Sequence, residues 1–167
     1  AHIVIMGAGL GGLPAAFEMK EALRKEDRVT GVSNSATFHF VPSNPWVAVD
    51  WRKREDIELD LATILGRKGI AFSAAGVKRV HPEKSQLELG DGGTLDYDYL
   101  VIATGPKLAF EEVEGLGPDG HSHSICHVDH AGHAEKAWSE FVKGPGPVVG
   151  GAVQGASCFG PAYAFAA

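Results

Sequence analysis

The stretch His2–Gly12, HIVIMGAGLGG, decides the fold of this chain. Its first five residues form an apolar run of strand length, and Gly7, Gly9 and Gly12 then supply a Gly-x-Gly-x-x-Gly pattern. A helical pattern over residues 13–23 follows directly. In such a unit the first glycine allows a tight turn, the second lets the backbone approach a diphosphate, and the third lets the helix pack against the strand. The stretch therefore predicts a dinucleotide site at a helix N-terminus, and a glycine-rich turn without a ligand is the alternative.

Strand-like and helix-like patterns alternate along the rest of the chain, which predicts an α/β fold with a parallel sheet and an inserted β-meander. The expected elements are a second parallel strand over 29–32, a helix over 57–65, a short strand over 70–72, a hairpin-like pair over 77–80 and 86–89, and a central parallel strand over 100–103. A further strand over 147–151 would begin a second dinucleotide-binding-like domain.

A segment rich in aromatic residues, 37–51, is expected to be a loop that Pro42 and Pro45 stiffen. Aromatic side chains beside a rigid backbone suit a flat ring ligand. An ordinary surface loop anchored by aromatic residues is an equal alternative.

Composition excludes several classes of function. The chain has 167 residues and a formal net charge of −6, so it carries no basic surface for nucleic acid. Its longest apolar runs have strand length, so no membrane span is expected, and no signal peptide is recognised. Two cysteines, Cys126 and Cys158, are too few for a disulfide scaffold. Because Phe159–Ala167 reads as the start of a helix, we expect the chain to be the N-terminal part of a larger protein.

Polar and small residues follow two of the predicted parallel strands, where α/β sheets bind ligands. Ser33 and Asn34 follow the second strand, at the place where an acidic residue usually holds a ribose. A hydroxyl and an amide can also bond a ribose, although less strongly than a carboxylate. Thr104 and Gly105 follow the last strand of the first domain.

Three stretches together resemble sulfide:quinone oxidoreductase, a family of flavoprotein reductases with two dinucleotide-binding domains. They are FVPSNPW at 40–46, ATGPKL at 103–108 and GASCFGPAY at 155–163. The resemblance implies a Rossmann-like FAD-binding domain over 1–110, a linker and helix over 111–145, and the start of a second Rossmann-like domain over 146–167. It implies FAD as cofactor, held by Gly7, Gly9, Gly11, Gly12, Ser33, Asn34, Pro42, Val77, Thr104 and Gly105.

The same resemblance implies an oxidoreductase that oxidises sulfide to polysulfide or sulfur and passes the electrons to a membrane quinone. Peripheral attachment to a prokaryotic inner membrane, through a part beyond residue 167, and assembly into a homo-oligomer would accompany this activity. The alternatives are the flavin subunit of flavocytochrome c sulfide dehydrogenase and a non-enzymatic nucleotide- or metal-binding module. A nicotinamide site in the second domain is not expected, because Gly150–Gly155 has the wrong glycine spacing.

Cys158 is the first candidate for catalysis, because it precedes a predicted helix whose N-terminus would lower the pKa of the thiol. A buried structural cysteine is the alternative. The resemblance adds a second redox-active cysteine beyond residue 167, a lesser role for Cys126 and proton handling by His130. Histidines 121–133 invite a metal-site hypothesis, but a solvated histidine-rich linker is favoured and no metal is assigned.

Overall fold

The computed structural model describes residues 1–155, 160 and 162. The chain divides into two compact units. The first contains Ala1–His39 and Glu58–Lys107, and the second contains Phe40–Ile57 and Leu108–Ala167. Cys158 lies outside the described residues. The domain boundaries expected from the sequence stay a prediction.

The first unit is built on a four-stranded parallel sheet with the order β5-β2-β1-β9. The strands are β1 (His2–Met6), β2 (Arg28–Val32), β5 (Ala71–Ser73) and β9 (Tyr99–Ile102). The helix α1 (Gly12–Ala22) connects β1 to β2. The predicted α/β fold with a parallel sheet is therefore confirmed. This is the Rossmann-like arrangement that the opening stretch indicates.

The position of β9 corrects the sequence-based prediction of a central strand. β9 is parallel, but it lies at one end of the described sheet and pairs with β1 alone. Its last residue, Ile102, is 62% exposed. A continuous apolar run predicts burial on both faces, and it cannot tell how many neighbouring strands the chain supplies.

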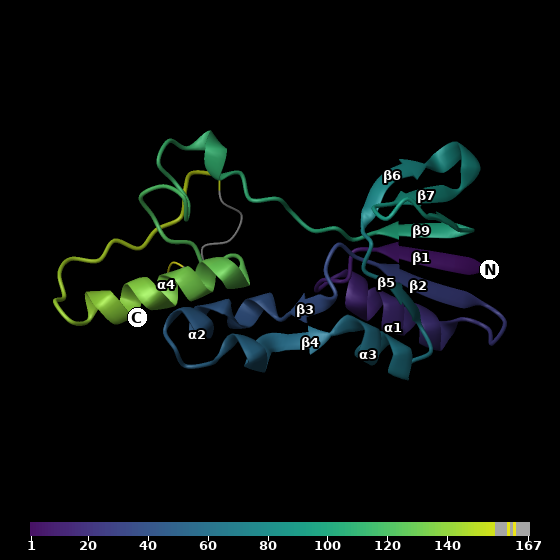
Figure 1. The fold of residues 1–167 in the computed structure, drawn as a ribbon, viewed down its shortest axis with the longest axis horizontal. Helices are drawn as coiled ribbons and strands as arrows, with labels where there is room; N and C mark the ends of the chain where they lie inside the picture. Colours follow the sequence, from purple (N-terminus) through teal and green to yellow (C-terminus); the bar gives the residue numbers. More distant parts are fainter. Residues whose placement is uncertain (156–159, 161, 163–167) are drawn as a thin grey trace. The chain divides into compact units, whose positions relative to one another are not determined.

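Alternate residues of β1 serve the two faces of the sheet, as the two-residue period of a strand requires. Ile3 and Ile5 pack into a core with residues of α1 and of α3 (Leu61–Arg67). Val4 points the other way and packs with Leu87 of the meander. Figure 1 shows the two helices on one side of the sheet and the meander on the other.

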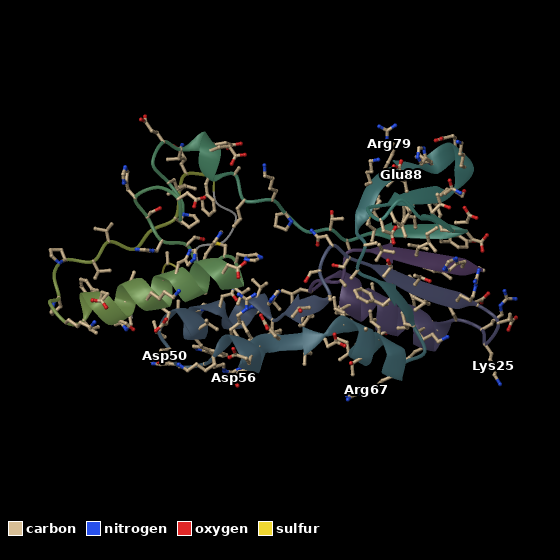
Figure 2. All side chains as sticks on the ribbon, viewed as in Figure 1. Lys25, Asp50, Asp56, Arg67, Arg79 and Glu88 are labelled. Atoms are coloured by element: carbon tan, nitrogen blue, oxygen red, sulfur yellow. The ribbon has the colours of Figure 1, made fainter. Side chains whose placement is uncertain are left out.

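The meander consists of β6 (Val77–His81), β7 (Gln86–Leu89) and β8 (Thr94–Asp96), paired antiparallel in that order. The hairpin predicted for β6 and β7 is confirmed. Arg79 lies opposite Glu88 in its register, and Figure 2 labels both side chains. Glu88 also accepts a 2.7 Å hydrogen bond from Lys78, which lowers the pKa of its carboxyl group.

A substitution at Leu87 tests this packing, because the side chain of Leu87 is 0% exposed and lies between the meander and the sheet. We expect Leu87→Ala to lower the free energy of unfolding by about 2–5 kcal/mol through lost burial and a residual cavity. Leu59→Ala is the matched control, because Leu59 is 49% exposed on β4 (Glu58–Asp60) of the same unit. Thermal and denaturant unfolding measure both effects. Equal losses in the two variants would contradict the packing described here.

The helix predicted over residues 57–65 begins later than expected. Glu58–Asp60 forms β4, which pairs antiparallel with β3 (Thr37–His39), and α3 starts at Leu61. Asp60 caps α3, because its carboxylate accepts a 2.7 Å hydrogen bond from the backbone N–H of Thr63. The predicted helix exists, but its predicted start was wrong, because the apolar spacing extends to the N-terminal side of Asp60 and a helix begins only after its N-cap residue.

The prediction of a loop over residues 37–51 was also wrong. After β3 the chain forms a 3₁₀ helix, Val41–Ser43, and then α2 (Asn44–Ala48). Both helices lie in the second unit. Each of these short helices carries a proline in its first two positions. Proline has no N–H to leave unpaired there, and its fixed φ suits the first turn. The two prolines therefore start helices in this segment.

The second unit also contains α4 (Val128–Phe141), and its core is formed between α2 and α4. Its buried members are Val47, Ala48, Ile57, Val128 and Ala131. The predicted linker histidines His130 and His133 belong to α4.

Residues 147–151 form neither strand nor helix, so the strand prediction for this segment was wrong. Val149 is 96% exposed, and no described strand pairs with this segment. An apolar run becomes a parallel strand only where a neighbouring strand accepts its hydrogen bonds. Separately, no helix within the described residues is both long and apolar enough to cross a membrane.

Candidate functional site

The four parallel strands end level with one another, which brings their following loops to one edge of the sheet. Met6 is in register with Val32 and with Ile102, and Val32 is in register with Ser73. The next residues continue the pairing: Gly7 N–H donates to Val32 at 2.8 Å, and Ala103 N–H donates to Met6 at 2.8 Å. The loops after β1, β2 and β9 therefore meet at the edge where α/β sheets bind ligands.

Two glycines of the first loop are required by close backbone contacts. Gly7 has φ +104°, and a Cβ there would lie 2.2 Å from the carbonyl oxygen of Ala103. A Cβ on Gly12 would lie 1.8 Å from the carbonyl oxygen of Gly7. The structure thus confirms the tight turn and the close helix packing that the sequence indicated.

The other two glycines of this loop face open space. A Cβ at Gly9 or Gly11 would meet no atom within 4 Å, and both residues are exposed. In the described part of the chain, no side chain caps α1 and no acidic side chain occupies its first turn. The positive end of the helix dipole is therefore uncompensated beside an open backbone. This combination fits a bound diphosphate.

The loop after β2 contains the residues predicted to bind the ribose. Ser33 is half-buried, and its hydroxyl oxygen accepts a 3.3 Å hydrogen bond from the N–H of Ser35. Asn34 is exposed. Gly76, with φ +68°, lies against Asn34 and donates a 2.8 Å hydrogen bond to the carbonyl of Ser33. Val77, the next residue, begins β6, so these predicted residues are brought together.

The loop after β9 contacts the glycine loop directly. The Cα of Thr104 lies 3.0 Å from the position of a Cβ on Gly7. Thr104 and Gly105 are exposed, and Gly105 has φ +73°. The structure therefore brings together nine of the ten predicted cofactor residues within the first unit. The tenth, Pro42, belongs to the second unit. Cofactor binding by all ten residues stays a prediction.

The two described catalytic candidates, Cys126 and His130, both belong to the second unit. Cys126 is exposed and forms no disulfide. His130 is half-buried in the first turn of α4, with its ring centroid 5.6 Å from those of Phe110 and His127. Within the described residues its Nδ1 is buried without a hydrogen-bond partner.

Burial lowers the pKa of His130, and the neighbouring His127 lowers it further, while Asp129 opposes the shift. The imidazole is therefore held in its neutral form, in which one ring nitrogen can accept a proton.

The pKa of His130 makes the stability of the second unit depend on pH. A lowered folded-state pKa contributes stability above the unfolded value of 6.5, and this stability is lost as the pH falls below that value. We expect His130→Phe to flatten the decline in unfolding free energy below pH 6.5 while keeping a ring against Phe110. Denaturant unfolding at a series of pH values measures the decline. An equally steep decline in the variant would show that His130 does not titrate in this way.

Among the described residues, no three His, Cys, Asp or Glu side chains come together as a possible set of metal ligands.

Asn44 is a residue that the sequence reasoning missed. It is 1% exposed at the start of α2, and its side-chain amide donates a 3.0 Å hydrogen bond to the carbonyl of Ile125. The sequence shows Asn44 only as a polar residue between Pro42 and Pro45, and it gives no signal of this burial.

Comparisons with known proteins fit this geometry. The model of the pyridine nucleotide-disulphide oxidoreductase family matches residues 1–164. The chain is 41% identical over 165 residues to a sulfide-quinone reductase of Aquifex aeolicus, which covers 99% of this chain and 37% of that protein. It is 32% identical over 114 residues to a mitochondrial sulfide:quinone oxidoreductase of Dictyostelium discoideum, covering 68% of this chain and 25% of that protein.

A solved structure agrees with these sequence matches. The X-ray structure of the sulfide:quinone oxidoreductase from Aquifex aeolicus superimposes with a TM-score of 0.92 and 41% identity. The match covers 99% of this chain and 38% of that one. The chain thus spans well under half of the length of these relatives.

The fold and the open glycine loop, Gly7–Gly12, define a dinucleotide-binding flavoprotein domain. The chain belongs to the pyridine nucleotide-disulphide oxidoreductase family. The resemblance to sulfide:quinone oxidoreductases noted in the sequence is confirmed by the comparisons, and FAD is the cofactor that these relationships assign.

Proposed function

We propose that this chain is the N-terminal part of an enzyme that oxidises sulfide with FAD and passes the electrons to quinone. The observation that carries the proposal is the 41% sequence identity to the Aquifex sulfide-quinone reductase, which extends over 99% of the chain. The open glycine loop supports the proposal, because an enzyme that uses FAD needs a site for the diphosphate at the start of α1.

FAD, when bound, supplies the two-electron chemistry, and the protein supplies position and electrostatics. In our proposal the backbone of Gly9 and Gly11 and the N-terminus of α1 hold the diphosphate. Ser33 and Asn34 bond the ribose. Val77, Thr104 and Gly105 line the remaining length of the cofactor, together with the backbone at Pro42.

The sulfur chemistry is assigned to cysteine. Cys158 and a second cysteine beyond residue 167 are proposed to hold sulfur in a persulfide or trisulfide bridge. Sulfide would attack this bridge, so that one S–S bond forms as another breaks and a cysteine thiolate is released, and re-forming the bridge would give two electrons to FAD. Cys126 takes a lesser part in sulfur handling. His130 is proposed to handle a proton, because its lowered pKa keeps the imidazole neutral and a neutral ring has a nitrogen that can accept one.

Quinone as the electron acceptor implies contact with a membrane surface. We propose peripheral attachment to a prokaryotic inner membrane through a part of the protein outside this chain. We also propose that the full-length protein assembles into a homo-oligomer.

A comparison of electron acceptors tests the proposed activity. The full-length protein is mixed with sulfide under anaerobic conditions, and the reduction of decylubiquinone and of cytochrome c is measured by absorbance. We expect sulfide-dependent reduction of decylubiquinone. Reduction of cytochrome c alone would favour the flavocytochrome c alternative, and a protein without flavin absorption would favour the non-enzymatic module.

A further inference from the structure

The backbone on both sides of Cys126 is held by local hydrogen bonds. The N–H of Cys126 donates to the hydroxyl oxygen of Ser124 at 3.2 Å. His127 is the N-cap of α4: its Nδ1 accepts from the N–H of Asp129 at 3.3 Å, and its carbonyl accepts from Ala131 at 2.9 Å. These bonds fix local conformation, but all of them lie within seven residues of each other.

Asn44 joins this segment to a distant part of the chain. Its Nδ2 donates a 3.0 Å hydrogen bond to the carbonyl of Ile125, the residue directly before Cys126 and 81 positions away. The amide is immobilised because Asn44 begins α2, whose Val47 and Ala48 pack against Val128 and Ala131 of α4. Figure 1 shows α2 and α4 side by side.

The burial of Asn44 is energetically costly, and one hydrogen bond compensates for part of that cost. In the described structure, its Oδ1 and the neighbouring Ser43 Oγ are both buried without a hydrogen-bond partner. A buried polar atom without a partner destabilises a protein, and an apolar residue of similar volume would avoid this cost. What the amide provides at this position is the donor for the carbonyl of Ile125.

We propose that Asn44 is a positioning residue that fixes the backbone carrying Cys126 against α2 and thereby sets the reactivity of this thiol. The inference rests on the proposed function, because that function gives Cys126 its part in sulfur handling. Asn44 acts through the carbonyl of Ile125 and touches no reactant itself.

Two variants of similar size separate the donor from the volume. Asn44→Leu removes the donor at every pH. Asn44→Asp restores a donor only when its carboxyl group is protonated, since the O–H can then bond the carbonyl of Ile125, whereas the carboxylate would repel it. Burial raises the pKa of such a carboxyl group towards neutral pH, so both states fall within an accessible range.

The readout is the rate at which iodoacetamide alkylates Cys126 in the full-length protein, followed by mass spectrometry and divided by the wild-type rate at the same pH. We expect Asn44→Leu to change this ratio about five- to tenfold at all pH values, the range that one lost hydrogen bond allows. Asn44→Asp should remain near the wild-type rate at acidic pH and approach the rate of the leucine variant at alkaline pH.

Ser43→Ala is the matched control. Ser43 is fully buried beside Asn44, and its hydroxyl makes no hydrogen bond among the described residues, so the alkylation rate should stay at the wild-type value. If Asn44→Leu does not fold, the pH dependence of Asn44→Asp decides. The inference is overturned if the aspartate variant shows no pH-dependent departure from wild type, or if Ser43→Ala changes the rate as much.

This readout is independent of turnover. A wild-type protein that does not oxidise sulfide refutes the proposed function, whereas the alkylation ratios still report on Asn44. If the wild type is active, the Asn44→Leu variant should lose turnover number about tenfold with little change in the KM for quinone. Unchanged alkylation ratios in an active enzyme refute the inference alone.

Discussion

Gly12→Ala is expected to yield a full-length protein that does not fold into a stable FAD-containing form. The added Cβ would lie 1.8 Å from the carbonyl oxygen of Gly7, far closer than any van der Waals contact allows. The obstacle is backbone, which cannot rotate away as a side chain can. α1 would have to move off β1, and this would open the core that contains Ile3, Leu13 and Ala16.

The measurement is the amount of soluble protein and its flavin absorption after purification. Gly66→Ala is the matched control, because Gly66 lies in α3 of the same unit and a Cβ there meets nothing within 4 Å. Alanine in a helix is favoured over glycine by about 0.5–1 kcal/mol, so the control should retain its flavin and be at least as stable as wild type. A folded, yellow Gly12→Ala protein would contradict the close approach of α1 and β1.

Cys158→Ala is expected to abolish the reduction of bound flavin by sulfide, slowing it on the order of a thousandfold or more, as the loss of a covalent nucleophile does. This prediction rests on the sequence and the resemblance, since Cys158 lies outside the described residues. Stopped-flow absorbance of the full-length protein after anaerobic mixing with sulfide measures the rate.

Chemical reduction of the same variant provides the control. Dithionite needs no cysteine, so it should still bleach the flavin at the wild-type rate. Sulfide-dependent bleaching at an undiminished rate would remove Cys158 from the proposed chemistry, whatever the outcome with dithionite.

The sheet and its glycine loop were predictable because their signals are local. The apolar strand, the glycine spacing and the following helical pattern lie within some twenty residues of each other, and each constrains the next. The meander was predictable for the same reason, since turn residues separate short alternating strands.

The errors arose where a single residue overrides a pattern, or where pairing is non-local. Asp60 ends one element and caps the next, although the apolar spacing around it continues. Pro42 and Pro45 stiffen the chain, as expected, but at positions where they start helices. Nothing local in residues 100–103 or 147–151 indicates which neighbouring strand is available to pair with them.

The candidate site shows the same division. The register of β1, β2 and β9 brings Gly7, Ser33 and Thr104 to one edge, and a parallel sheet makes this predictable. Asn44 was not predictable, because its importance depends on a hydrogen bond to a carbonyl 81 residues away. Burial and long-range bonding of a single polar side chain have no signature in one sequence.

The most direct test of the central claim is a crystal structure of the full-length protein purified with its flavin. We expect the FAD diphosphate to lie within hydrogen-bonding distance of backbone N–H groups in Gly9–Gly12, at the start of α1. A diphosphate bound elsewhere, with this loop closed by side chains, would contradict this expectation.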